Sequence, residues 1–335
     1  MKYIRILALT LCLSFLFSAC TAAQSFPTRP VTMVIPFGAG NASDLFARRF
    51  TAIASDHLGQ TIRCINISGN QTGEAIAYVY EQPADGYTVM EVTPSLLLSE
   101  MRTLHEIEQR RAETSAPMLI QEIIFRDEFE PLLRVEADIQ LFGIAPGSRF
   151  DSLEELLAYA KEHPGELTIG GTSPGGLDEY IARGFAKAAG IQWTYVAYQS
   201  SDEALAALLD GTLDVYQDKM LRFLPLVQEG TVHPLVILNE ERVDVDGLAA
   251  CPTTEEMGIS FTQGSWRGFV VKKGTPQEVK ATLIDSLKNA YLDPAYGELA
   301  EKNHTNIRTG YLEAEEWQAQ WDEEYTALSE IFFEQ

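Results

Sequence analysis

Residues 37–48 read Phe-Gly-Ala-Gly-Asn-Ala-Ser-Asp-Leu-Phe-Ala-Arg, and residues 171–183 read Gly-Thr-Ser-Pro-Gly-Gly-Leu-Asp-Glu-Tyr-Ile-Ala-Arg. Each stretch follows a short apolar run and contains a glycine-rich loop, an aspartate, an aromatic residue and an Ala-Arg pair. Two lobes with the same strand, loop and helix geometry would produce this repeat, although chance would also produce it. The repeat is the first indication of a two-lobed chain.

Short apolar runs alternate with longer stretches of helical spacing along most of the sequence. The expected strands span residues 31–35, 62–67, 88–92, 132–144, 167–169 and 193–196. The expected helices span residues 43–58, 73–80, 153–162, 177–189, 203–209, 276–291 and 314–332. This alternation predicts an α/β fold in which helices cover both faces of parallel sheets. The charge-rich residues 96–128, which include Arg102 at helical spacing, are expected to form a solvated helix at a domain edge.

The N-terminus has the order of a secretory signal: Lys2 and Arg5, an apolar run to Phe17, then small residues. The run is shorter than the roughly 20 residues that a membrane-spanning helix needs. Residues 16–20, Leu-Phe-Ser-Ala-Cys, resemble a bacterial lipobox, in which Cys20 would become the acylated first residue. Residues 1–23 are therefore predicted to be a signal that exports the protein, with a lipid anchor at Cys20 or simple cleavage nearby.

Composition narrows the class of partner. The chain has 335 residues and a formal charge of −23, which argues against nucleic acid and anionic membranes as partners. Any anion-binding site must therefore depend on local groups that act against the net negative charge of the protein. Cys64 and Cys251 would either pair or remain separate buried thiols, and the five histidines show no metal-ligand spacing. We expect neither a metal nor a cofactor.

Several expected strands run directly into helix starts, where unpaired N–H groups form natural anion sites. The alternative is that these loops have only a structural role, as helix caps and tight turns. Asp44 and Asp178 are interpreted as residues that cap a helix or hold a loop, rather than as a catalytic acid and base.

Two enzyme interpretations fail on mechanism. The Gly38-x-Gly40 pattern suggests a dinucleotide loop, but Ser43 occupies the position of the third glycine. Residues 171–175 match the Gly-x-Ser-x-Gly nucleophile elbow around Ser173, but Pro174 has no N–H to donate to an oxyanion. We therefore expect a binding protein and not an enzyme, with a Ser173-dependent hydrolase as the lesser alternative.

Residues 26–44, Phe-Pro-Thr-Arg-Pro-Val-Thr-Met-Val-Ile-Pro-Phe-Gly-Ala-Gly-Asn-Ala-Ser-Asp, resemble the start of the tripartite tricarboxylate transporter receptors, also called Bug proteins. Further resembling blocks follow in order: residues 84–88, 165–176, 195–198, 208–218, 264–268 and 274–276. The resemblance covers nearly everything from residue 26 onward. It implies a type II periplasmic-binding-protein fold: two lobes, each with a doubly wound mixed sheet, around a ligand cleft.

The resemblance also implies a plan of domains and a function. It places the first lobe at residues 26–135, the second at 136–238, and a return to the first at 239–335. The implied protein is a periplasmic monomer that captures a di- or tricarboxylate, or another organic acid, and delivers it to a permease with one large and one small subunit. A ligand-sensing module that partners a sensor kinase is the alternative. The implied ligand residues are Phe37, Gly38, Ala39, Gly40, Asn41, Ser43, Asp44, Thr93, Thr172, Ser173, Gly175, Gly176, Tyr198, Ser200 and Asp218.

The sequence departs from the family pattern at a few points. The family's first loop is Pro-Gly-Gly-like, whereas residues 38–41 read Gly-Ala-Gly-Asn, so Asn41 would add a polar contact. Lys219 follows Asp218 where a small polar residue is common, and Arg267 follows Trp266 where an aromatic residue is common. Arg267, or Lys219, in the cleft would bind a second carboxylate, for which arginine offers bidentate geometry. The alternative is that both point to solvent. The 96–128 stretch is also longer than the family leads us to expect.

Overall fold

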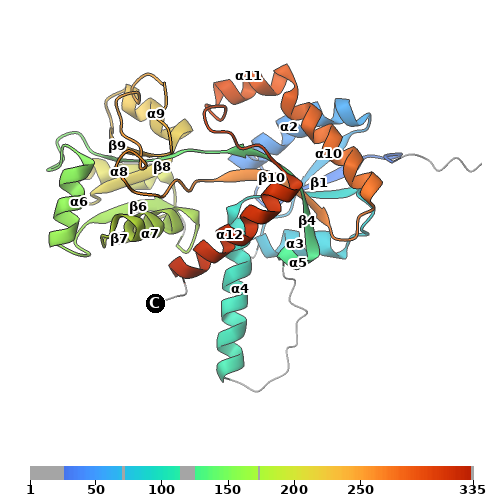
Figure 1. Cartoon of the computed structure of the whole chain (residues 1–335), viewed down its shortest axis with the longest axis horizontal. Helices are drawn as coiled ribbons and strands as arrows, with labels where there is room; N and C mark the ends of the chain where they lie inside the picture. The colour runs from blue at the N-terminus through green and yellow to red at the C-terminus, as the bar shows by residue number, and fades with distance from the viewer. Residues whose placement is uncertain (1–25, 70–71, 114–124, 173, 333–335) are drawn as a thin grey trace, which may run out of the picture.

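The computed structural model describes residues 26–69, 72–113, 125–172 and 174–332. Its strands form two separate mixed sheets that lie beside each other (Figure 1). The first sheet has the order β11-β4-β10-β3-β1-β2, with β1 Val31–Ile35, β2 Ile62–Asn66, β3 Thr88–Val92, β4 Phe129–Ala137, β10 Trp266–Lys272 and β11 Leu312–Glu313. The second has the order β7-β6-β8-β5-β9, with β5 Gln140–Ile144, β6 Thr168–Thr172, β7 Thr194–Tyr198, β8 Val215–Lys219 and β9 His233–Leu238.

Helices cover both faces of each sheet. On the first sheet, α2 Ala42–Leu58, α10 Gln277–Leu292 and α11 Pro294–Lys302 share one apolar cluster, and the other face carries α3 Gly73–Glu81, α4 Pro94–Glu113, α5 Phe125–Glu128 and α12 Ala314–Phe332. On the second, α6 Leu153–Glu162 and α7 Leu177–Ala189 lie opposite α8 Ser201–Asp210 and α9 Met220–Gln228. The predicted α/β fold with two doubly wound mixed sheets is confirmed. No helix in the described part of the chain is both long and apolar enough to cross a membrane.

The connections between the sheets differ from the expectation. Residues 132–144 were expected to be one strand, but β4 ends at Ala137 in the first sheet and β5 begins at Gln140 in the second. Asp138 and Ile139 therefore carry the chain across. The error arose because residues 132–144 are buried throughout, so no exposed turn marks the break.

The chain returns to the first sheet later than residue 239. Leu248 and Cys251 still pack in the apolar cluster of the second sheet, and Thr253 forms a bridge with Ile237 of β9. The crossing back therefore comes just before β10, which begins at Trp266.

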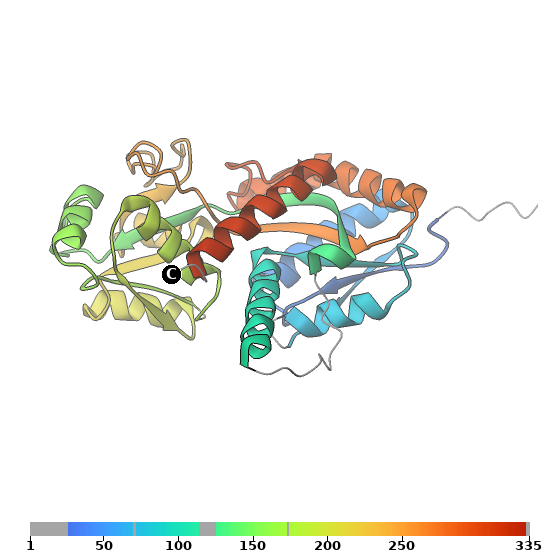
Figure 2. The same cartoon turned by 60° about the horizontal axis from the view of Figure 1, so that its bottom comes forward.

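Helix α12 and helix α4 tie the architecture together. Helix α12 lies across the molecule and contacts β4 of the first sheet and α7 beside the second (Figure 2). Helix α4 projects from the first lobe (Figure 1), but Leu96, Leu97, Leu98 and Met101 in its first half are buried. The expectation of a solvated helix was wrong for this half, which packs against the core.

Candidate functional site

A cavity of about 490 Å³ lies between the two lobes. The first lobe contributes Pro36, Phe37, Gly38, Asn41, Ser68, Gly69, Thr72, Ser95, Leu98 and Arg102, and the second contributes Pro174 and Gly176. The structure thus brings Phe37, Gly38, Asn41 and Gly176 of the predicted ligand residues to one cavity. Ser173 and Cys20 lie outside the described residues.

The first loop is held open by a local network. Asn41 caps α2 by accepting the N–H of Asp44 at 2.9 Å, and Asp44 accepts the N–H of Gly40 at 2.9 Å. Asp44 also accepts bonds from Arg48 at 2.8 Å and from Asn66 at 2.8 Å. The bonds from Arg48, Gly40 and Asn66 lower the pKa of Asp44 to about 2, so it stays ionised and holds the loop, as the sequence predicted.

The second loop uses a similar device, displaced by one residue from the expected alignment. Glu179 accepts the N–H of Gly175 at 2.6 Å and pairs with Arg183 at 2.6 Å, as Asp44 does with Gly40 and Arg48. Asp178 instead accepts the N–H and hydroxyl of Thr172, at 2.8 and 2.7 Å. Burial raises the pKa of Asp178, and the bonds from Thr172 oppose that shift.

Strand β6 extends further than expected, through Gly170 and Gly171 to Thr172. A Cβ on Gly171 would lie 2.7 Å from the Gln217 amide and 2.8 Å from Asp178. Glycine is therefore required here for packing under the loop, and the glycine-rich segment is only partly a loop.

The remaining predicted residues do not line this cavity. Thr93 is buried and its hydroxyl accepts the N–H of Ser95 at 3.3 Å, while Ser200 caps α8 by accepting the N–H of Glu203. Asp218 accepts the Tyr216 hydroxyl at 2.6 Å and pairs with Arg222 at 3.3 Å. Ala39, Gly40, Ser43, Asp44, Thr172, Gly175 and Tyr198 also lie outside the lining.

Arg267 lies inside a cluster of carboxylates, which we call the crossing cluster: Arg267, Glu91, Glu136, Asp138 and Lys219. Its side chain bonds to Glu136, lies 3.3 Å from Asp138, and lies 3.9 Å from Glu91. Lys219, at the end of β8, lies 3.8 Å from Asp138. Arg267 is 4% exposed, so the alternative that it points to solvent is wrong.

Burial in the crossing cluster raises the pKa of Glu91 to about 8 and also raises that of Glu136, while Arg267 opposes both shifts. Three carboxylates face two cations there, so one bound proton balances the charge. The folded protein then holds a proton that the unfolded chain releases near pH 4.5. The contribution of this bound proton to the free energy of unfolding is fully present below about pH 4.5 and is lost as the pH rises to about 8.

We expect the free energy of unfolding, measured with urea from pH 5 to 8, to fall less steeply in Glu91→Gln than in the wild type. The difference should approach about one proton, or about 1.4 kcal/mol per pH unit at its steepest. The exposed Glu154→Gln serves as control, and parallel curves for Glu91→Gln and the wild type would contradict the assignment.

Four further residues of the cavity were not predicted from the sequence: Arg102, Thr72, Ser68 and Ser95. Arg102 belongs to the charge-rich stretch, where a cation is usually interpreted as part of a solvated face. Only the packing of Leu98 and Met101 into the core turns Arg102 toward the cavity, and that apolar spacing was the available signal.

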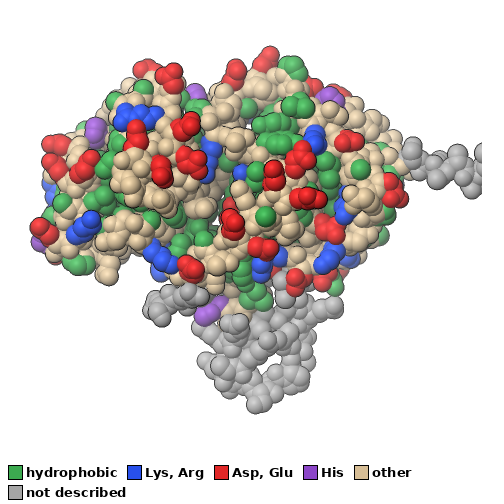
Figure 3. Space-filling view, in the orientation of Figure 1, with side chains coloured by type: hydrophobic (Ala, Val, Ile, Leu, Met, Phe, Trp, Pro, Cys, Tyr) green, Lys and Arg blue, Asp and Glu red, His purple; other side chains and the backbone are tan. Residues whose placement is uncertain are grey.

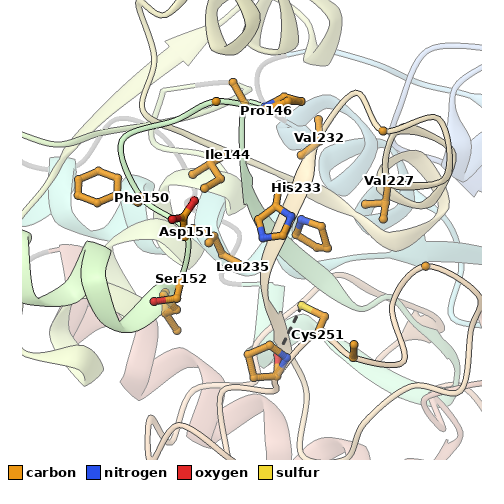
Figure 4. A pocket seen from close by; sticks show the side chains of 18 of the residues that line it. Ile144, Pro146, Phe150, Asp151, Ser152, Val227, Val232, His233, Leu235 and Cys251 are labelled. Atoms are coloured by element: carbon orange, nitrogen blue, oxygen red, sulfur yellow. Dashed lines mark hydrogen bonds between the residues drawn. The ribbon is translucent and has the colours of Figure 1, made fainter.

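A larger cavity, of about 680 Å³, lies in the second lobe at the end of β5 away from the crossing. Asp151, Ser152, His233 and Cys251 lie around it, with no lysine or arginine among its described lining residues (Figure 4). Burial raises the pKa of Cys251 to about 12, so this thiol is unreactive at neutral pH. Because its described lining has no lysine or arginine, this cavity does not suit an anion.

Among the residues that the structure describes, no group of three or more side chains is placed to hold a metal ion. Cys64 and Cys251 are both free thiols, so the alternative of a disulfide between them is wrong. Acidic side chains are spread over both lobes on the face shown in Figure 3.

A model of the tripartite tricarboxylate transporter family receptor matches residues 46–312. The chain belongs to this receptor family. The receptor is 28% identical over 289 residues to the UPF0065 protein in the gbd 5' region of Cupriavidus necator, an overlap of 84% of this chain and 80% of that one. The resemblance found in the sequence is confirmed.

Two solved structures show how closely the receptor follows the fold. A TctC solute binding protein from Polaromonas, without ligand, has a TM-score of 0.75 and 21% identity, covering 92% of this receptor and 99% of that chain. A structure of an R. palustris protein with adipate has a TM-score of 0.67 and 25% identity, covering 92% and 97%. The receptor is therefore a solute-binding protein by family and by architecture.

Proposed function

We propose that this receptor is an exported protein that captures a small carboxylate between its lobes and passes it to a two-subunit membrane permease. One observation carries the proposal: Phe37, Gly38, Asn41, Pro174 and Gly176 line one cavity from the equivalent loops of both lobes. Backbone N–H groups at helix starts favour an anion, and glycine lets the ligand approach them closely. The similar structure with adipate supports a carboxylate as the ligand class.

The two lobes are proposed to close on the ligand by bending at the segments that join them. These are Asp138 and Ile139 on one path and the residues between β9 and β10 on the other. The predicted signal in residues 1–23 supports export and an anchor at Cys20, and the loop network of Asp44 supports a binding role over a catalytic one.

We expect one class of carboxylate to raise the melting temperature of the mature protein in a panel that includes mono-, di- and tricarboxylates, amino acids and sugars. A ligand at 100 times its dissociation constant stabilises the folded state by about 2.7 kcal/mol. Silence across the panel, or turnover of the ligand that is lost in Ser173→Ala, would contradict the proposal.

A paired variant locates the binding site. Gly38 lines the cavity, and a Cβ there meets nothing within 4 Å, so Gly38→Leu should fill the cavity without straining the loop. We expect it to abolish the thermal shift. The control is Gly297→Leu, since Gly297 lies exposed on α11 and its Cβ also meets nothing within 4 Å.

A further inference from the structure

The cavity between the lobes has a charged end. Among its described lining residues Arg102 alone carries a positive charge, and none carries a negative one. Arg102 extends from α4 of the first lobe toward the loop of the second: a Cβ built on Gly175 would lie 3.1 Å from its guanidinium. In a strongly acidic protein, such a cation concentrates attraction for anions in this cavity.

A second feature of the cavity points to a ligand independently. Thr72 is 6% exposed, lines the cavity, and its hydroxyl has no hydrogen-bond partner among the residues that the structure describes. Its backbone is in the left-handed region, with φ of 81°, although a β-branched residue is strained there. Its hydroxyl makes no capping bond to α3. Buried hydroxyls are normally satisfied, and strained residues cluster at ligand sites.

Thr72 and Arg102 complement the loops already assigned. Thr72 precedes α3, whose N-terminus favours negative charge, and α4 supplies the guanidinium. Glu74 carries a negative charge that would repel an anionic ligand. Its carboxylate lies against Gly69, however, and does not line the cavity. Arginine matches a carboxylate with two parallel hydrogen bonds.

We propose that Arg102 and the Thr72 hydroxyl form a second subsite that holds the far carboxylate of the ligand and makes the receptor selective for dicarboxylates. This rests on the proposed function, in which the loops at Gly38 and Gly176 hold the first carboxylate. It gives the 96–128 stretch a role, since α4 delivers Arg102 into the cleft. Arg102, rather than Arg267, is the residue that the ligand meets.

The test compares dissociation constants of the mature protein for two matched pairs, adipate with hexanoate and succinate with butanoate, by calorimetry. The wild type should bind a dicarboxylate more tightly than its matched monocarboxylate. Arg102→Gln should weaken the dicarboxylate about 10- to 100-fold and leave the monocarboxylate nearly unchanged, because a hydrogen bond to a charged group is lost. Arg102→Lys keeps the positive charge but loses the bidentate guanidinium, so its dissociation constant for the dicarboxylate should lie between those of the wild type and Arg102→Gln.

A threonine variant and a charge control complete the set. Thr72→Gly removes the hydroxyl and accepts the left-handed backbone, so it should fold and weaken dicarboxylates by about 2- to 10-fold. Arg49→Gln, at an exposed position on α2, makes the same change of charge as Arg102→Gln and should alter the binding of neither ligand.

The outcomes separate the two proposals. If the wild type binds no carboxylate, the proposed function fails and this subsite falls with it. If the wild type binds carboxylates but does not prefer the dicarboxylates, or if Arg102→Gln weakens both members of a pair equally or neither, the subsite alone is overturned.

Discussion

Replacing Arg267 by methionine is expected to lower the free energy of unfolding by about 3–5 kcal/mol, because it leaves buried carboxylates without their cation. Glu136 and Asp138 both accept bonds from Arg267, and Glu91, whose carboxylate has no hydrogen-bond partner among the described residues, lies 3.9 Å from Arg267. Methionine fills similar space, so the loss reports charge and not volume. Urea denaturation at pH 7 measures it.

Two further variants make the test specific. Arg242→Met removes an exposed pair with Glu256 and should cost less than about 1 kcal/mol. Adding Glu136→Gln to Arg267→Met should restore part of the loss, since it removes the carboxylate that is bonded to Arg267. A loss below about 1 kcal/mol for Arg267→Met would show that water reaches the cluster and screens it.

The crossing cluster lies where the chain passes between the lobes. Asp138 belongs to the crossing segment itself, Arg267 to β10, and Lys219 to the second sheet. The contact between Lys219 and Asp138 therefore joins the second lobe to the crossing. Arg267, one of the two residues that the sequence offered for a second carboxylate, is instead buried among carboxylates at this crossing.

Most of the fold was predictable because its signals are local. The helix after β1 was expected from a cap and an acidic first turn, and the structure has both in Asn41 and Asp44. Strands buried on both faces show no alternation, so the break between Ala137 and Gln140 could not be read from periodicity.

The candidate site was likewise predictable only where its signals are local. Gly38, Asn41 and Gly176 were predicted because a loop between strand and helix is a short-range pattern. Arg102 and Thr72 were not, because their place depends on how distant segments pack. The aligned Asp178 was off by one for a related reason: only the bond from Gly175 identifies Glu179 as the counterpart of Asp44.

Helix α12 provides the second large effect: Trp317→Ala should lower the free energy of unfolding by about 3–5 kcal/mol. Trp317 is fully buried, and its ring packs against Trp266 and Trp321 at centroid distances of 5.4 and 5.1 Å. Removing it leaves a cavity under the helix that contacts both β4 and α7. Denaturant unfolding followed by circular dichroism measures the loss.

Gly268 tests the same contact from the opposite side. A Cβ on this residue of β10 would lie 2.2 Å from the Trp317 ring and 2.7 Å from the Leu133 carbonyl oxygen, so Gly268→Ala should also destabilise, by about 1–3 kcal/mol. Leu292→Ala, at a side chain that is 73% exposed, is the control and should change little. If Trp317→Ala cost no more than this control, α12 would not be packed on the first lobe as described. Because α12 also contacts α7, such a result would bring into question its contact with the second lobe as well.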